Sequence, residues 1–334
     1  MDKRFDVVAL GELTIDYMEV GMSNQGNPLY EANPGGAPCN VLAMLNHLDK
    51  RTAFIGKVGD DAFGHRLREI VKQSGTDVTN LLFDRKIPTT LAFAHLCPDG
   101  GFEFSFCRNP GADMMLTKGE INEDLIRNSQ IFHFGTLSSS YDISKEATRH
   151  AIGIAKDNGI LVSFDPNLRE MLWDSLEHAK EEIVYGLSKC DILKIADNEL
   201  EFLTGTENYD IGVQMINQKY HIPLICVTLG AEGSIAYYKE QKVRAHPFLL
   251  EKTIETTGAG DAFMACMLNC ILEHGLERLT MHQIEEMLIF ANAAAALVTT
   301  RKGALRVMPG KREIEELIKT YSQSSYTDLN GRVN

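Results

Sequence analysis

The 334-residue sequence lacks the features of several protein classes. Its seven cysteines are scattered, form no C-x-x-C pair and accompany no His cluster at zinc spacing, which predicts free, buried thiols in a reducing cytoplasm. No stretch approaches the roughly 18 apolar residues of a membrane span, and the opening residues turn polar too soon for a signal peptide. No G-x-G-x-x-G follows the first apolar run, which disfavours a dinucleotide-binding dehydrogenase.

Basic residues are also in short supply. Lys and Arg number 33 against 46 Asp and Glu, so the net charge of −13 repels nucleic acid and anionic membrane surfaces, and we expect neither as a partner. An anionic small ligand would need a local attraction, such as the N-terminus of a helix. Hydrophobic residues make up 44% and charged residues 24%, the balance of a globular protein with a full core.

The order of the apolar segments predicts an α/β fold. Short runs rich in β-branched residues, typical of buried strands, occupy 5–11, 52–59, 131–137, 160–166, 190–196 and 223–230. Segments with helical spacing lie between them, the clearest at 38–48, 62–75 and 143–159. This alternation predicts one main domain over 1–334, with a mostly parallel sheet between two layers of helices. Ligands of such folds gather at the carboxyl ends of the strands.

Two segments interrupt the alternation. Residues 89–108 alternate between apolar and polar side chains around the turn sequence PDGG, and residues 13–23 follow the first strand without a helix. We expect them to form a small β-sheet, with bounds of about 12–33 and 88–113. One face of that sheet would carry Phe102, Phe104 and Phe106. An apolar face needs a cover, which substrate, the main domain or a second subunit would supply.

The stretch ETTGAGDAFMACML at 255–268 is the strongest candidate for chemistry. Gly258, Ala259 and Gly260 leave the backbone bare just before a helix that begins near Asp261. Free amides at a helix N-terminus form an anion hole, which stabilises a phosphoryl group during transfer. Asp261 would accept a proton from an attacking hydroxyl, or it is simply the N-cap of the helix. The motif alone leaves both readings open.

Three further stretches place polar groups or glycines beside predicted strands and helices. Residues 33–48 set a Gly pair before a helix with Pro38 and Asn40 in its first turn, which suits close backbone approach or a plain turn. Residues 227–234 place glycines after a strand, suited to a nucleotide phosphate or a tight turn. Residues 164–173 end a strand with more polar groups than a strand end needs, namely Asp165, Asn167 and Arg169.

These motifs resemble the ribokinase, or PfkB, family of sugar kinases across nearly the whole chain. GGAPCN (35–40) is similar to the N-terminal signature of the family and TTGAGDAF (256–263) to its C-terminal one. Within the family, the segments at 165–173, 106–113 and 291–304 are most similar to bacterial fructokinases, with 2-keto-3-deoxygluconate kinases similar in the same places. The resemblance implies the three-layer ribokinase-like fold.

The implied reaction is ATP-dependent transfer of a phosphoryl group to the 6-hydroxyl of D-fructose. The alternatives are 2-keto-3-deoxygluconate kinase or another sugar kinase of the family. A non-catalytic sugar or nucleotide sensor on the same fold is disfavoured, because Asp261 and the whole loop before it are retained.

The resemblance also assigns roles to individual residues. Asp261 is the implied catalytic base, with the amides of Gly258, Ala259 and Gly260 as the anion hole. The implied sugar-binding residues are Asp16, Gly35, Gly36 and Asn40, with Arg108 and Arg169 near the sugar or the phosphate. The implied nucleotide-binding residues are Thr228, Gly230, Gly233 and Asn292. The small sheet corresponds to a lid, through which many members of the family form homodimers.

Two departures from the family pattern concern metal ions. Glu255 stands where the family commonly has Asp, at a position associated with a monovalent-cation loop, which puts K⁺ activation in doubt. The family's N-x-x-E motif maps onto 196–199, where Ala196 replaces the Asn and Glu199 keeps the acid. We therefore still expect Mg²⁺ to arrive with ATP, near Glu199.

Overall fold

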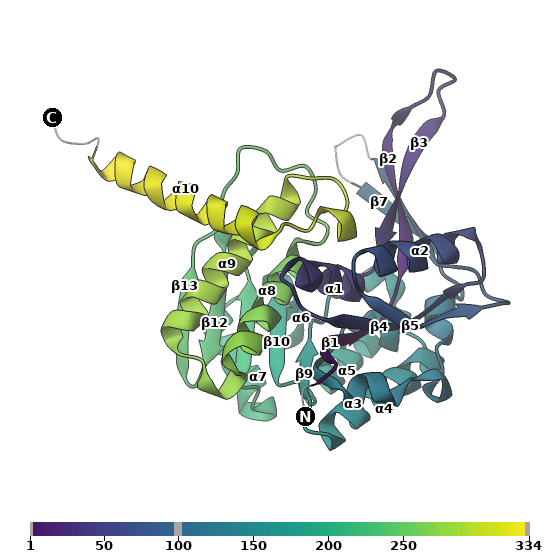
Figure 1. Ribbon diagram of the computed structural model, residues 1–334, viewed down its shortest axis with the longest axis horizontal. Coiled ribbons are helices and arrows are strands. Elements are labelled where there is room, and N and C mark those ends of the chain that lie inside the picture. The colour runs from purple at the N-terminus through teal and green to yellow at the C-terminus, as the bar shows by residue number, and fades with distance from the viewer. Residues whose placement is uncertain (1–2, 97–101, 331–334) are drawn as a thin grey trace.

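The computed structural model describes residues 3–96 and 102–330 (Figure 1). Within these residues, a nine-stranded sheet has the order β13-β12-β11-β10-β9-β8-β1-β4-β5. Its strands are β1 (Phe5–Leu10), β4 (Thr52–Gly59), β5 (Asp77–Asp84), β8 (Ser129–Phe134), β9 (Leu161–Phe164), β10 (Ile192–Ala196), β11 (Leu224–Thr228), β12 (Ser234–Tyr238) and β13 (Gln241–Ala245). Neighbouring strands from β5 to β11 pair in parallel, whereas β12 pairs antiparallel with both β11 and β13. The predicted, mostly parallel sheet is confirmed.

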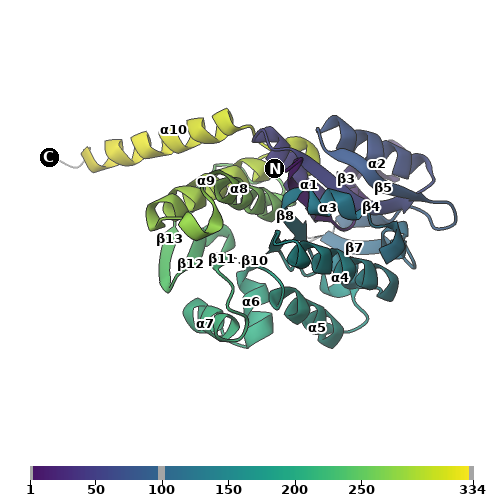
Figure 2. The ribbon, with the colours of Figure 1, turned by 60° about the horizontal axis from the view of Figure 1, so that its bottom comes forward.

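Helices cover both faces of this sheet (Figure 2). One face carries α1 (Ala37–His47), α2 (Ala62–Gln73), α8 (Ala259–His274), α9 (Met281–Thr299) and α10 (Lys311–Asn330). The other face carries α3 (Glu123–Arg127), α4 (Asp142–Asp157), α5 (Leu176–Leu187), α6 (Asp197–Thr204) and α7 (Tyr209–Tyr220). In β1, Val7 packs toward the first layer and Val8 toward the second, which is why this strand is a continuous apolar run.

A second sheet has the order β3-β2-β6-β7 and consists of β2 (Thr14–Met22), β3 (Pro28–Gly35), β6 (Leu91–Leu96) and β7 (Phe102–Cys107). The predicted hairpin is confirmed as the antiparallel pair β6 and β7, although its PDGG turn lies outside the described residues. β2 runs parallel to β6 and antiparallel to β3. The β2–β3 arm reaches away from the larger sheet in Figure 1.

The second sheet has two different faces. On one face Tyr17 stacks on Phe93, with ring centroids 4.8 Å apart, and meets Phe63 of α2 edge-on at 6.2 Å. On the other face Phe106, which pairs with Ala92, lines a cavity above the larger sheet. The side chains of Phe102 and Phe104 lie outside the described residues, so their cover stays a prediction. The side chain of Phe106 faces the cavity.

Candidate active site

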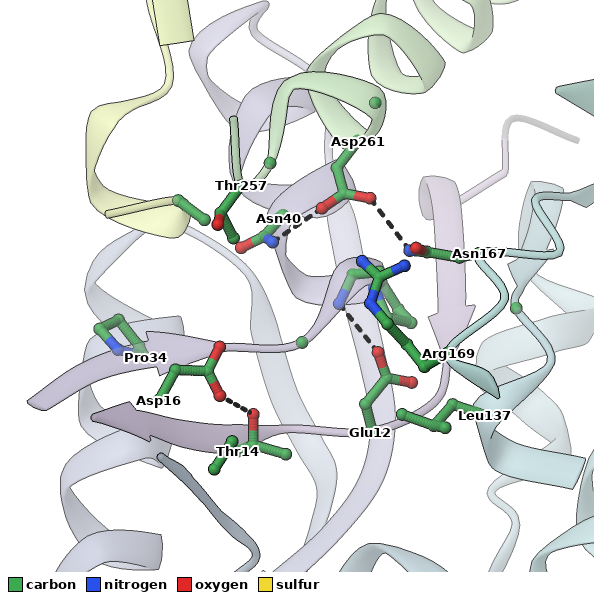
Figure 3. A pocket seen from close by; sticks show the side chains of 18 of the residues that line it. Glu12, Thr14, Asp16, Pro34, Asn40, Leu137, Asn167, Arg169, Thr257 and Asp261 are labelled. Carbon is green, nitrogen blue, oxygen red and sulfur yellow. Dashed lines mark hydrogen bonds between the residues drawn. The ribbon is translucent and has the colours of Figure 1, made fainter. Parts of the chain in front are cut away.

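A cavity of about 370 Å³ lies where β1, β8, β9 and β10 end, between the second sheet and the N-terminus of α8. This is the edge at which the strand order predicted a ligand site. The predicted site residues that line it are Asp16, Gly36, Asn40, Arg108, Arg169, Gly258, Gly260 and Asp261. Figure 3 shows how several of them face one another. Segments far apart in the sequence therefore share one site.

The N-terminus of α8 supplies unpaired amides to this cavity. The helix begins at Ala259 after Gly258, whose φ of 84° is left-handed and therefore favours glycine. The amides of Gly258, Gly260 and Asp261 have no partner in the described part of the chain. The predicted third donor, the amide of Ala259, instead donates to the Thr256 carbonyl at 3.2 Å. The anion hole that the structure offers thus contains the amide of Asp261 in place of that of Ala259.

Asp261 is not a helix cap. Its carboxylate is buried and accepts hydrogen bonds from the side-chain amides of Asn40 (2.8 Å) and Asn167 (3.5 Å) (Figure 3). Gly258 holds the N-cap position, so the capping alternative is wrong. Burial raises the pKa of Asp261, although the Asn40 hydrogen bond and the charge of Lys194 oppose this. A carboxylate with a raised pKa suits a general base.

Asn40 contacts Asp261 and also lines the cavity. It lies in the first turn of α1, is buried, and donates through Nδ2 to Asp261. Its Oδ1 atom is buried and has no hydrogen-bond partner in the described structure. An unmet buried acceptor is destabilising by roughly 1–3 kcal/mol, so this oxygen is suited to receive a hydrogen bond from a ligand hydroxyl.

Asp16 is a half-buried carboxylate of the cavity, and the glycine pair makes room for it. It accepts a hydrogen bond from Thr14 Oγ1 at 2.9 Å, and burial raises its pKa to about 6. A Cβ atom on Gly35 would lie 2.0 Å from Asp16 Oδ2, so a larger residue there would displace the carboxylate. Gly36 has a φ of 129°, and a Cβ there would lie 2.5 Å from the carbonyl oxygen of Glu12.

Three titratable side chains that line the cavity were not predicted from the sequence. Glu12 follows β1 and accepts from the amide of Ala37 at 2.9 Å, and burial raises its pKa to about 7. His133 lies on β8, where burial and the nearby charge of Lys194 lower its pKa to about 3, so it is neutral. Lys194 lies on β10 in an ion pair with Asp165. The sequence signal that could have identified these residues is a charged or polar side chain inside, or directly after, an apolar strand.

The guanidinium group of Arg108 has more hydrogen-bond partners in the protein than that of Arg169. Arg108 forms a buried ion pair with Asp113 at 2.8 Å and donates to Ser140 Oγ and the Leu137 carbonyl. Each of its side-chain nitrogens thus already has a protein partner, and it anchors the end of β7 to the loop after β8. Arg169 is exposed at the cavity and donates to the Leu168 carbonyl. Contacts of either residue with substrate stay predictions.

A family match covers most of the chain. Residues 4–310 match the model of the pfkB family carbohydrate kinases. The chain belongs to the pfkB family. This pfkB kinase is 40% identical over 315 residues to fructokinase-1 from Zea mays, covering 94% of the chain and 97% of that protein.

Solved structures agree with this assignment. A double mutant of Vibrio cholerae O395 fructokinase, in a form with fructose, ADP and potassium ion bound, is 30% identical, with a TM-score of 0.84 over 95% of this chain and 99% of that one. Fructokinase from Xylella fastidiosa with bound ATP is 28% identical, with a TM-score of 0.87 over 95% and 99% of the two chains. The ribokinase-like fold class of the pfkB kinase is confirmed.

The predicted nucleotide residues of this pfkB kinase lie beside the cavity rather than in its lining. Thr228 ends β11, next to the end of β10, and Gly230 and Gly233 form the turn into β12. A Cβ on Gly233 would lie 2.2 Å from the Ala245 carbonyl oxygen, so the turn itself requires this glycine. Asn292 accepts from Ser234 Oγ at 3.0 Å and donates to the His246 carbonyl at 3.0 Å. Their contacts with a nucleotide stay predictions.

Glu199 of the pfkB kinase has both carboxylate oxygens engaged. Oε1 accepts from the amide of Leu168 at 2.7 Å, and Oε2 accepts from the amide of Ala196 at 2.8 Å. Within residues 3–96 and 102–330, no group of three or more His, Cys, Asp or Glu side chains is placed to hold a metal ion. Mg²⁺ in kinases takes many of its ligands from phosphates and water, so the contact with Glu199 stays a prediction. No helix in the described part of the chain has the length and apolarity to span a membrane.

Proposed function

We propose that this pfkB kinase is an ATP-dependent fructokinase, which converts D-fructose and ATP to fructose 6-phosphate and ADP. The observation that carries the proposal is the pair of Asp261 and Asn40. A buried carboxylate accepts from Asn40, whose own oxygen is left without a partner, beside a helix N-terminus with unpaired amides. A fructose- and ADP-bound fructokinase shares the fold at 30% identity, which supports the choice of substrate.

In the proposed mechanism, the sugar lies between Asp16, the Gly36 backbone and Asn40, with its 6-hydroxyl at Asp261. Asp261 removes the hydroxyl proton as the oxygen attacks the γ-phosphorus in line, and the bond to the β-phosphate oxygen breaks to release ADP. The free amides of the α8 N-terminus stabilise charge on the transferring group. Mg²⁺ bound to ATP would neutralise phosphate charge.

The second sheet is the proposed lid. Asp16, Met18 and Phe106 project from its strands into the cavity lining, so the sheet covers the sugar side of the site. Closure over bound sugar would exclude water, which otherwise competes with the sugar for the phosphoryl group.

The charges around the sugar side favour a neutral substrate. Glu12 is a buried and Asp16 a half-buried carboxylate in this part of the cavity, and the guanidinium of Arg108 is paired with Asp113. A substrate carboxylate, as in 2-keto-3-deoxygluconate, would face these acids with Arg169 as its available cation. Hydroxyl groups, in contrast, donate well to carboxylates.

The first prediction concerns the acceptor. In a coupled assay of ATP consumption with fructose, 2-keto-3-deoxygluconate, ribose, tagatose phosphate and nucleosides, we expect the highest kcat/KM with fructose. The acids in the sugar half of the site disfavour anionic acceptors. A higher kcat/KM with 2-keto-3-deoxygluconate would contradict the fructokinase assignment and leave the kinase class intact.

The second prediction concerns potassium. Glu255 Oε2 accepts from the amide of Gly303 at 3.0 Å, and the Ile254 amide donates to the Thr299 carbonyl at 2.7 Å. Glu255 and Ile254 therefore connect two segments of the site through direct hydrogen bonds. We expect kcat to change little when K⁺ is replaced by a large organic cation at constant ionic strength. A severalfold fall in kcat on removal of K⁺ would refute this.

The third prediction is a homodimer formed through the lid. Its outer part exposes three apolar side chains: Val20 at 44%, Met22 at 65% and Leu29 at 48%. Exposed apolar residues gathered on one arm favour burial against a second chain. We expect a dimer in sedimentation at micromolar concentration, weakened by Leu29→Asp, because a buried unpaired carboxylate is costly.

The matched control for Leu29→Asp is Ile211→Asp, which changes a side chain of α7 that is 50% exposed and should leave the dimer intact. A monomeric wild-type protein would contradict the dimer. Within the described residues the cysteines are free thiols. This supports the further proposal of a cytoplasmic location.

A further inference from the structure

Lys194 is a buried cation of the cavity that the proposed mechanism does not use. It lies on β10 and is 6% exposed, with Nζ at 3.1 Å from Asp165 Oδ2 and 3.2 Å from Oδ1. It also lines the cavity, so its ammonium is directed to the site rather than hidden in the core. A buried ammonium is unfavourable unless it is paired. The presence of a lysine at this buried position therefore indicates that its charge has a role.

The ammonium of Lys194 lies against the first turn of α8. A Cβ atom on Gly260 would be 3.2 Å from Nζ and 3.7 Å from Cε of Lys194. Gly260 does not have a positive φ, unlike Gly258, so its backbone conformation does not require glycine. The bare Cα of Gly260 lets Lys194 approach closely, and a side chain there would displace the ammonium by a few tenths of an ångström. Positive charge is thereby held beside the free amides of Gly260 and Asp261.

The groups around Asp261 come from several elements. They are Asn40 of α1, His133 of β8, Asp165, Asn167 and Arg169 after β9, Lys194 of β10 and Glu199 of α6. Asp165 and Glu199 are acidic like Asp261, and His133 is neutral because burial lowers its pKa. Arg169 is exposed to solvent, which screens its charge. Lys194 is therefore the buried cation that offsets the carboxylates.

The charge state of Lys194 follows from the same neighbours. Burial by itself would lower the pKa of Lys194, but Asp165, Glu199 and Asp261 together raise it. The lysine is thus protonated throughout the neutral range. In return, its charge favours the ionised form of Asp261 and opposes the effect of burial on that carboxyl group.

We propose that Lys194 is a positioning residue for phosphoryl transfer, which acts through Asp261 and the N-terminus of α8. Held by Asp165 beneath Gly260, the ammonium keeps Asp261 ionised when the anionic phosphates of ATP enter the site. It also adds positive charge where the transferring group must lie. The proposal rests on the proposed function, because it assigns Lys194 to the step in which Asp261 takes a proton.

The test compares Lys194→Met with Lys194→Arg. In the methionine variant we expect kcat to fall about tenfold or more, and the acidic limb of the kcat–pH profile to move up by about one unit, since Asp261 protonates more readily without the cation. Affinities for fructose, measured by calorimetry, should change much less. Arginine restores the charge, so the limb should return toward its wild-type position.

Lys57→Met is the matched control. Lys57 is also a buried lysine, paired with Glu120 at 2.8 Å and Asp84 at 3.4 Å, but it does not line the cavity. Loss of the Lys57 ammonium should lower the melting temperature without shifting the acidic limb of the kcat–pH profile. If Lys194→Met does not fold by circular dichroism, Lys194→Gln replaces it, because its amide still donates to Asp165 and the same shift is expected.

Two results would overturn the proposal. One is a folded Lys194→Met enzyme with a wild-type limb and kcat. The other is an equal loss of kcat in the methionine and arginine variants, with the acidic limb of the kcat–pH profile unchanged. That result would show that Lys194 acts through packing rather than through its charge. Absence of phosphoryl transfer by the wild type would instead defeat the proposed function. The Lys194 proposal is then judged by the pH titration of the Asp261 carboxyl carbon in NMR, in the wild type and in Lys194→Met.

Discussion

The Asp261→Asn variant should lose about 10²- to 10⁴-fold in kcat, the usual cost of removing a general base. Asparagine has nearly the same size and can still hydrogen-bond with Asn40 and Asn167, so the fold should survive. Affinities for fructose and ATP should change much less, because Asp16 and the glycine-rich segments remain. The measurement is kcat beside calorimetric affinities, with circular dichroism to confirm folding.

Asp61→Asn provides the control for that variant. Asp61 is a true N-cap, whose carboxylate accepts from the amide of Gly64 at 2.8 Å at the start of α2. Asparagine caps helices about as well as aspartate, but its Nδ2 atom cannot accept the bond that Asp61 Oδ2 receives from the amide of Thr89 at 2.8 Å. This variant should therefore lower the melting temperature and keep kcat. Near-wild-type turnover in Asp261→Asn would leave the proposed mechanism without its base.

The Asp16→Asn variant should weaken sugar binding strongly while making the free protein more stable. A hydrogen bond to a charged group contributes about 1.5–3 kcal/mol, so loss of one such bond from a fructose hydroxyl should raise KM about 10- to 150-fold. The second effect arises because burial raises the pKa of Asp16 to about 6, which means that its charged form is disfavoured in the folded state.

The stability effect of Asp16→Asn depends on pH in a defined direction. Between the ordinary pKa of an aspartate and about 6, the folded state holds a proton that the unfolded state has lost, so stability falls as pH rises through this window. At pH 8 Asp16 is ionised in the folded wild type, which bears the full free-energy cost of that charge. Asp16→Asn should therefore melt at a higher temperature. The difference should shrink as pH falls toward 4.

Melting curves of the sugar-free proteins from pH 4 to 8 measure this difference. Glu31→Gln is a suitable control, because Glu31 lies on the same sheet but is exposed. If Asp16→Asn melted below the wild type at every pH, the Asp16 carboxylate would be stabilising rather than strained. An unchanged fructose KM would remove Asp16 from the sugar site.

The sequence by itself determined most strands of the parallel sheet, several helices and the places where chemistry is concentrated. Buried strands such as β1 and β11 are continuous apolar runs, and the helices α2 and α4 have clear periodicity, so local pattern was sufficient for them. The motifs around Asn40 and Asp261 placed glycines before helix starts, which suits an anion hole or a plain turn and cap, and the resemblance to the pfkB family favoured the anion hole. These features depend on neighbours within one or two turns of the chain.

Only the tertiary structure decided which polar groups are free to act. Asn40 and Asp261 are 221 positions apart and meet through one hydrogen bond, while the guanidinium of Arg108, although it lines the cavity, is already paired with Asp113. Lys194 is one residue in an apolar strand, yet packing places its ammonium against Gly260. Hydrogen bonds and charges depend on distances of a few ångströms between segments, and no local pattern in the chain specifies those distances.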